Sequence, residues 1–65
     1  MTIQNNVKNL RSEKNITQEQ LGDSVGVSRQ TIVAIEKGSY TPSLMLAMQL
    51  ARFFKVSVEQ LFRIQ

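Results

Sequence analysis

The segment from Thr17 to Gly38 constrains the fold more than any other part of this chain. Thr17 and Ser28 each precede a helical pattern, where a side-chain hydroxyl can accept hydrogen bonds from free backbone N–H groups. Gln20 follows Thr17 at the spacing of a capping box. Gly26 lies between the two patterns, and glycine readily adopts the positive φ that a tight turn requires. We therefore predict two short helices joined by a glycine turn.

The two faces of this helical pair differ in composition. Apolar side chains recur at helical spacing and are predicted to point inward: Leu21, Val25, Val27, Ile32 and Ile35. The second helix carries small and polar side chains on its outer face: Arg29, Gln30, Val33, Ala34 and Lys37. Such a face on a helix held by a short turn is typical of a helix-turn-helix, whose second helix enters the major groove of DNA.

Helical patterns also precede and follow this pair. We predict five helices in all, over residues 5 or 6 to 14, 18–25, 29–37, 43–54 and 58–61. Thr41 is predicted to cap the fourth helix, with Pro42 at its first position, and Ser57 to cap the fifth. The residues predicted to form the buried face of the fourth helix are Leu44, Leu46, Ala47, Leu50, Ala51 and Phe54. Three further apolar residues of this helix are assigned mostly to the core: Met45, Met48 and Phe53.

The composition limits the kinds of function that the chain can have. Sixty-five residues suffice for a single domain over residues 1–65, and a net charge of +3 modestly favours a nucleic-acid partner. The chain has neither cysteine nor histidine, and no arrangement of a nucleophile with a base. We therefore expect no cofactor, no metal and no enzyme activity. Since no apolar run could span a membrane and the first residues lack a signal-peptide pattern, we expect a cytoplasmic protein.

Four stretches of the chain carry a family resemblance: LRSEKNITQEQLG, VGVSRQTIVAIEKG, the TPS that follows it, and LARFFKVSVEQLF. With these pieces in order, the chain resembles the Cro/CI-type (XRE) helix-turn-helix regulators over nearly its whole length, and among them the compact cytolysin-repressor type. One departure is Gly22, where the family usually has alanine. Glycine inside a helix costs about 0.5–1 kcal/mol, but it permits close approach of two helices. The resemblance implies an all-α, five-helix lambda-repressor-like DNA-binding domain.

The two ends of the chain alternate apolar and polar residues, over 1–4 and 62–65. Four residues of alternation are a weak strand signal, and both ends could instead fray. The resemblance to the compact type favours a small antiparallel two-stranded sheet formed by the termini.

The resemblance also implies DNA-contacting roles on and around the third helix. The residues expected at base edges are Arg29, Gln30, Val33 and Ala34. Arginine can pair with guanine and glutamine with adenine through two hydrogen bonds each, although at isolated positions both would simply be solvated. The residues expected at backbone phosphates are Gln18, Thr31, Lys37, Ser39, Tyr40 and, weakly, Asn9. For Gln18 the alternative is simple exposure, and for Tyr40 it is packing against the fourth helix.

Two further groups of residues are assigned to contacts within the protein. By the resemblance, Arg11 and Glu36 form an ion pair between the first and third helices, which orients the third. So small a monomer cannot bury all the apolar surface of Leu61, Phe62 and Ile64. We therefore expect these residues at a dimer interface. The alternative is that Phe62 and Ile64 complete the monomer core.

These features predict a sequence-specific regulator of transcription. We expect a dimeric repressor whose third helix reads a pseudo-palindromic operator in double-stranded DNA. The alternative is an antitoxin that binds a protein toxin and represses its own operon through the same helices, and a co-regulator is another candidate protein partner. A protein-binding role without DNA is the third hypothesis.

Overall fold

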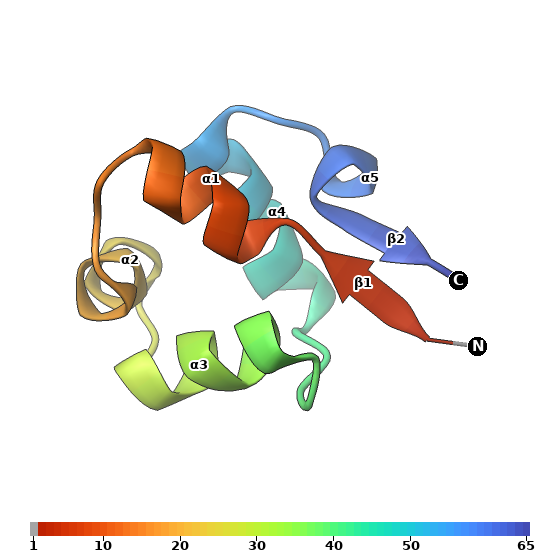
Figure 1. Ribbon diagram of the computed structural model, residues 1–65, viewed down its shortest axis with the longest axis horizontal. Helices are drawn as coiled ribbons and strands as arrows, with labels where there is room; N and C mark the ends of the chain where they lie inside the picture. The colour runs from red at the N-terminus through yellow and green to blue at the C-terminus, as the bar shows by residue number, and fades with distance from the viewer. Residues whose placement is uncertain (1) are drawn as a thin grey trace.

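The computed structural model describes residues 2–65. Along the chain the elements are β1 (Ile3–Asn5), α1 (Val7–Glu13), α2 (Gln18–Val25), α3 (Arg29–Lys37), α4 (Leu44–Phe54), α5 (Val58–Leu61) and β2 (Phe62–Ile64). The helices surround one core, and the two strands pair at one end of the molecule, beside both termini (Figure 1). The prediction of five helices is confirmed, and the bounds of α2, α3 and α5 agree with the sequence patterns.

The terminal sheet is antiparallel and joins the two ends of the chain. Ile3 lies opposite Ile64 in the register of the two strands. Two backbone hydrogen bonds between Thr2 and Gln65 extend the pairing, with N···O distances of 2.8 and 2.7 Å. The prediction of a sheet formed by the termini is therefore confirmed in preference to frayed ends. Met1, which belongs to the predicted alternation, lies outside the described residues.

Local capping explains where α2 and α3 begin and end. The Thr17 hydroxyl accepts a hydrogen bond from the Gln20 backbone N–H at 3.0 Å, and the Gln20 side chain accepts one from the Thr17 N–H at 2.8 Å. The predicted capping box is thus present. Ser28 caps α3 by accepting from a backbone N–H three residues on, at 3.2 Å. Gly26 and Gly38 end α2 and α3 with φ of 80° and 81°, in the left-handed region where glycine has no steric cost.

Gly22 lies where α2 approaches the turn before α3. A Cβ at this position would lie 2.6 Å from the carbonyl oxygen of Val27, well inside van der Waals contact. The Gly22 carbonyl itself accepts a hydrogen bond from the Val27 N–H at 2.9 Å. Glycine therefore allows a closer approach of the two helices here than a side chain would.

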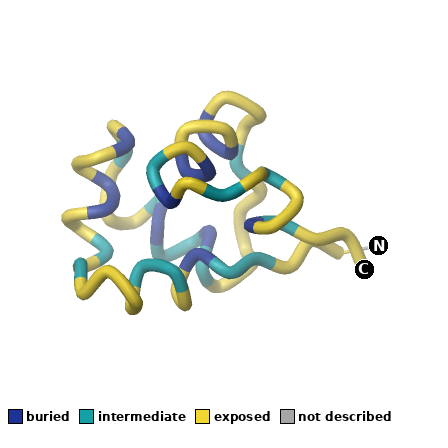
Figure 2. Tube along the Cα trace, turned by 90° about the horizontal axis from the view of Figure 1, so that it is seen from above, coloured by how far each residue is buried: buried dark blue, intermediate teal, exposed yellow. Residues whose placement is uncertain are grey.

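The core takes one face from each helix, so buried and exposed segments alternate along the chain (Figure 2). The most deeply buried large side chains are Leu21, Ile32, Ile35, Leu50, Leu61 and Val7. Of the inward residues predicted for the helix-turn-helix, all are buried except Val27, which is half-buried and packs against the core. The helical spacing of α2 and α3 therefore identified their inner faces correctly.

The first turn of α4 differs from the prediction. Ser43 caps this helix by accepting a hydrogen bond from the Leu46 N–H at 3.1 Å. The predicted cap at Thr41 is therefore wrong, and Pro42 precedes the helix instead of taking its first position. The reason is that the extended backbone needed at a cap occurs at Ser43, with φ −60° and ψ 161°.

The outer face of α4 is more apolar than predicted. Leu44, Met45 and Met48 were assigned to the core by sequence, but they are 73%, 70% and 55% exposed. A helix completes a turn every 3.6 residues, so the face that buries residues 46, 47, 50, 51 and 54 leaves these three outside. Phe53 is half-buried and contacts the buried Phe54 edge-on, with ring centroids 5.1 Å apart.

Candidate nucleic-acid interface

α3 lies along one edge of the molecule, with its first residues in contact with solvent (Figure 1). Arg29 and Gln30 begin the helix, and both are exposed. Within residues 2–65, no carboxylate lies within salt-bridge distance of Arg29. Val33 and Ala34 follow one turn later and are partly exposed. The outer face of α3 therefore presents two long polar side chains and, beyond them, two small apolar ones.

An ion pair ties the end of α3 to α1. The Nε of Arg11 donates to one carboxylate oxygen of Glu36 at 2.8 Å, and a terminal nitrogen donates to the other at 3.2 Å. The other terminal nitrogen of Arg11 donates to the Ile16 carbonyl at 3.0 Å. The hydrogen bond that Arg11 donates to Glu36 raises the pKa of Arg11, against the opposing effect of burial, so the guanidinium stays charged. The pair that the family resemblance implies is therefore present, with side chains only 14% and 5% exposed.

The same carboxylate also holds Gln18, the first residue of α2. The Gln18 amide nitrogen donates to a carboxylate oxygen of Glu36 at 3.0 Å. A carboxylate only accepts hydrogen bonds, so the amide must turn its nitrogen toward Glu36, which leaves one amide hydrogen for another acceptor. Gln18 is thus half-buried and oriented, in contrast to the freely exposed side chain that the alternative reading expected.

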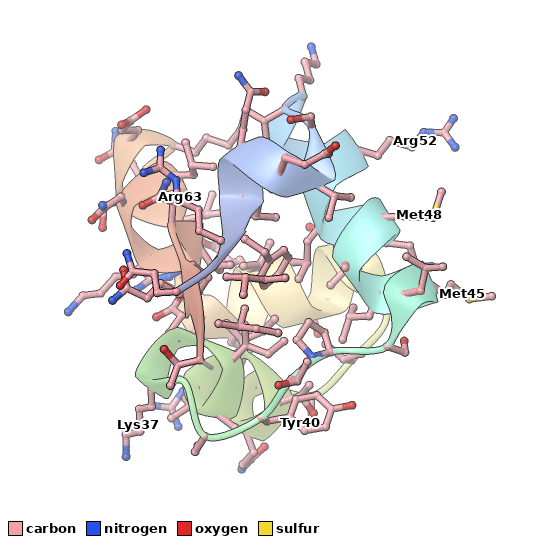
Figure 3. The ribbon with its side chains drawn as sticks, turned by 90° about the vertical axis from the view of Figure 1, so that its right-hand side faces the viewer. Lys37, Tyr40, Met45, Met48, Arg52 and Arg63 are labelled. Carbon is pink, nitrogen blue, oxygen red and sulfur yellow. The ribbon has the colours of Figure 1, made fainter. Side chains whose placement is uncertain are left out.

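Three candidate phosphate-contacting residues follow one another at the other end of α3. Lys37 and Tyr40 are both exposed, and Figure 3 shows them along the edge formed by α3 and the chain that follows it. Tyr40 is 46% exposed and is not among the partly buried hydrophobic residues that pack against the core. Ser39 is exposed as well, but its hydroxyl donates to the Ala34 carbonyl at 3.3 Å and so helps to cap the helix.

The two remaining candidates lie apart from this arrangement. Thr31 is partly exposed, and its hydroxyl oxygen is 3.2 Å from that of Ser28, at the start of α3. Asn9 is exposed on α1. It is not among the residues that line the hollow shared by Gln18 and Arg29, so the structure does not group it with the other candidates.

Sequence patterns did not indicate the role of Asn5, in β1. Its amide nitrogen donates to the carbonyl of Ile35 at 2.9 Å, and its amide oxygen accepts from the Val7 N–H at 3.1 Å. Asn5 therefore joins the terminal sheet to the last turn of α3 and to the start of α1. This contact spans 30 positions, and no short-range pattern in the chain signals it.

The predicted dimer residues divide between the inside and the outside of the monomer. Leu61 is 0% exposed, so its assignment to an interface is wrong, because the single turn of α5 directs it into the core. Phe62 is half-buried, and Ile64 is 69% exposed. A shallow apolar groove, which we call the terminal groove, is lined mainly by Ile3, Leu44, Ala47, Val58, Phe62 and Ile64.

Other kinds of site find no support in the part of the chain that the structure describes. Residues 2–65 contain no cluster of three or more carboxylate, thiol or imidazole side chains that could hold a metal ion. None of the helices in these residues is long and apolar enough to cross a membrane.

Comparisons with known proteins agree with this geometry. A helix-turn-helix family model matches residues 7–61. An uncharacterised HTH-type transcriptional regulator of Methanocaldococcus jannaschii is 53% identical over 60 residues, which cover 92% of this chain and 91% of the relative. The regulator YgzD of Bacillus subtilis, described in the same words, is 48% identical with the same coverage.

A solved structure gives the same result at the level of the fold. The P22 c2 repressor, crystallised with a synthetic operator, superimposes with a TM-score of 0.79 at 26% sequence identity. The match covers 82% of this chain and 80% of the repressor chain. The names of these relatives indicate transcriptional regulators with a helix-turn-helix, in agreement with the sequence-based expectation of a DNA-binding regulator. The chain belongs to the helix-turn-helix family of transcriptional regulators, of the Cro/CI (XRE) type.

Proposed function

We propose that the protein is a dimeric transcriptional repressor that reads a pseudo-palindromic DNA operator with α3 in the major groove. The observation that carries this proposal is the contrast along α3. Arg29 and Gln30 are exposed at its start, whereas partly buried contacts from Arg11 and Asn5 hold its end. A recognition helix needs both properties, since its side chains must reach base edges at a fixed docking angle.

The first turn of α3 supplies the side chains for base recognition. Arg29 can donate to O6 and N7 of guanine, and Gln30 can pair with N6 and N7 of adenine. Each such pair contributes roughly 1–3 kcal/mol of discrimination against the wrong base. Val33 and Ala34 are small enough to allow close approach, and their methyl groups can contact the methyl group of thymine.

The phosphate contacts lie on both sides of this turn. Gln18 offers its remaining amide hydrogen at the start of α2, where the helix dipole also favours an anion. At the other end, Lys37 supplies a charge, while Ser39 and Tyr40 supply hydroxyl groups. Thr31 can reach either a phosphate or a thymine methyl group.

The terminal groove is the surface that we assign to a second copy of the chain. The structure measures 30 × 22 × 20 Å, and the terminal sheet lies at one end of the longest axis (Figure 1). Two copies joined at this end would separate their α3 helices by about one molecular length, close to the ~34–36 Å between half-sites one DNA turn apart. We expect Ile64→Asp to turn the dimer into a monomer in sedimentation measurements, because a charge would then enter the groove.

The terminal groove also keeps the antitoxin hypothesis open, because a toxin could bind the same apolar surface. The two hypotheses predict different oligomeric states for the protein when no partner is present. A repressor that dimerises through this groove sediments as a dimer without a partner, whereas a groove reserved for a toxin leaves the free protein monomeric.

Selection of bound duplexes from a random DNA pool tests the proposal, with the wild type and Arg29→Ala side by side. We expect a symmetric enriched site, and relaxed preference at one base pair of each half-site in the variant. Arg52→Ala, which removes an exposed arginine of α4, serves as the control and should leave the selected sequence unchanged. Enrichment of no sequence by the wild type would contradict the proposed function.

A further inference from the structure

A shallow hollow lies beside the proposed reading face, between α1 and the first residues of α2 and α3. Its volume is about 680 Å³, and its charged lining consists of Lys8, Arg11, Glu19 and Arg29. Gln18, the proposed phosphate contact, also lines it. The hollow therefore joins the residue proposed to read guanine to a residue of α1 that sequence analysis did not single out, Lys8.

The charges around this hollow are not balanced. Arg11 is neutralised by its ion pair with the buried carboxylate of Glu36. Within residues 2–65 neither Lys8 nor Arg29 has a carboxylate within salt-bridge distance, and Glu19 is the single acidic side chain of the lining. The hollow consequently carries a net positive charge next to the amide of Gln18.

We propose that this hollow holds the phosphodiester backbone beside the groove that α3 reads, and that Lys8 is a phosphate-contacting residue. The inference rests on the proposed function, because it uses α3 in the major groove to bring the backbone to the hollow. Lys8 is exposed and, as a flexible point charge, suits a phosphate better than a base edge. It takes the role on α1 that sequence analysis assigned weakly to Asn9, its neighbour about 100° around the helix.

A phosphate contact has a signature that a merely structural residue lacks. Each neutralised phosphate releases counterions, so the slope of log K against log salt changes by about 0.9 per contact. Lys8→Gln should reduce the magnitude of this slope by about 0.9 per bound protomer. The advantage of the wild type over the variant should therefore shrink about 3.5-fold per protomer when the salt concentration rises four-fold.

The measurement is fluorescence anisotropy on the duplex that the wild type selects and on a scrambled duplex, over a four-fold range of salt. Lys8→Gln is expected to weaken both complexes by the same factor, and Lys8→Arg to retain the wild-type slope. Arg52→Gln, the charge-matched control on α4, should keep that slope as well. Glu19→Gln, which removes the one negative charge of the lining, should strengthen both complexes.

The outcomes separate the inference from the function on which it rests. A wild-type slope for Lys8→Gln, or an equal loss for Arg52→Gln, overturns the role of Lys8 while the selected sequence still supports the repressor. If the wild type selects no sequence, the proposed function fails, and the slope on the scrambled duplex still decides whether Lys8 contacts phosphate. A wild type that binds neither duplex overturns both.

Discussion

The two ends of α3 are held in different ways. At the start, Ser28 caps the helix through a hydrogen bond within its own turn, and Arg29 and Gln30 are exposed. At the end, contacts arrive from three other elements. Glu36 accepts hydrogen bonds from α1 and α2, and the Ile35 carbonyl accepts one from β1.

This difference separates the positioning of the helix from the contacts that it can make outside. The long-range contacts at the end orient α3 against the rest of the protein. Arg29 and Gln30 at the start are therefore not needed to hold the helix in place. The side-chain hydrogen bond at the start is local, and Arg29 and Gln30 remain exposed and available for another molecule. The comparison implies that substitutions at the end of α3 cost more stability than substitutions at its start.

The largest effect is expected from Glu36→Gln. The substitution removes the counter-charge of the Arg11 guanidinium, which is almost buried. Removing one partner of a buried ion pair costs about 3–5 kcal/mol. We expect a loss of about 3 kcal/mol in the free energy of unfolding, measured by urea denaturation. Glu13→Gln removes an exposed glutamate of α1 and should change it by less than about 0.5 kcal/mol. Equal losses in the two variants would show that Glu36 does not anchor the end of α3.

A smaller loss is expected from Asn5→Ala. The substitution removes both hydrogen bonds of the Asn5 amide and leaves the Ile35 carbonyl and the Val7 N–H without these partners. We expect about 1–3 kcal/mol of destabilisation in the same denaturation experiment. Gln4→Ala, on the neighbouring exposed position of β1, is the control. An unchanged midpoint for Asn5→Ala would show that the terminal sheet does not support α3.

Ser28→Ala should have the smallest effect of the three. Loss of an N-cap side chain costs about 1 kcal/mol, since the Thr31 N–H loses its hydroxyl acceptor and keeps only the Ser28 carbonyl. The control is Ser12→Ala, an exposed serine of α1. If Ser28→Ala destabilises the protein more than Glu36→Gln does, the start of α3 is the better anchored end.

Short-range signals in the sequence predicted the helix-turn-helix correctly. The capping box at Thr17, the cap at Ser28 and the left-handed turns at Gly26 and Gly38 each act over a few residues. Such features depend on backbone geometry that neighbouring residues impose on one another, and they can therefore be predicted from the sequence. The Arg11–Glu36 pair became predictable only through the family resemblance, since 25 positions separate the two residues.

Tertiary structure decided which apolar surfaces are covered. Nearly all of α4 is apolar, so helical periodicity shows which residues share a face but does not select the face that packs inward. Contacts with the other helices bury Leu50 and leave Leu44 and Met48 in solvent, and the turn of α5 buries Leu61 while Ile64 stays outside. The sequence determined the helix-turn-helix and its caps because these are local. The position of the terminal groove, the orientation of Gln18 by Glu36 and the link from Asn5 to α3 depend on residues that only folding brings together.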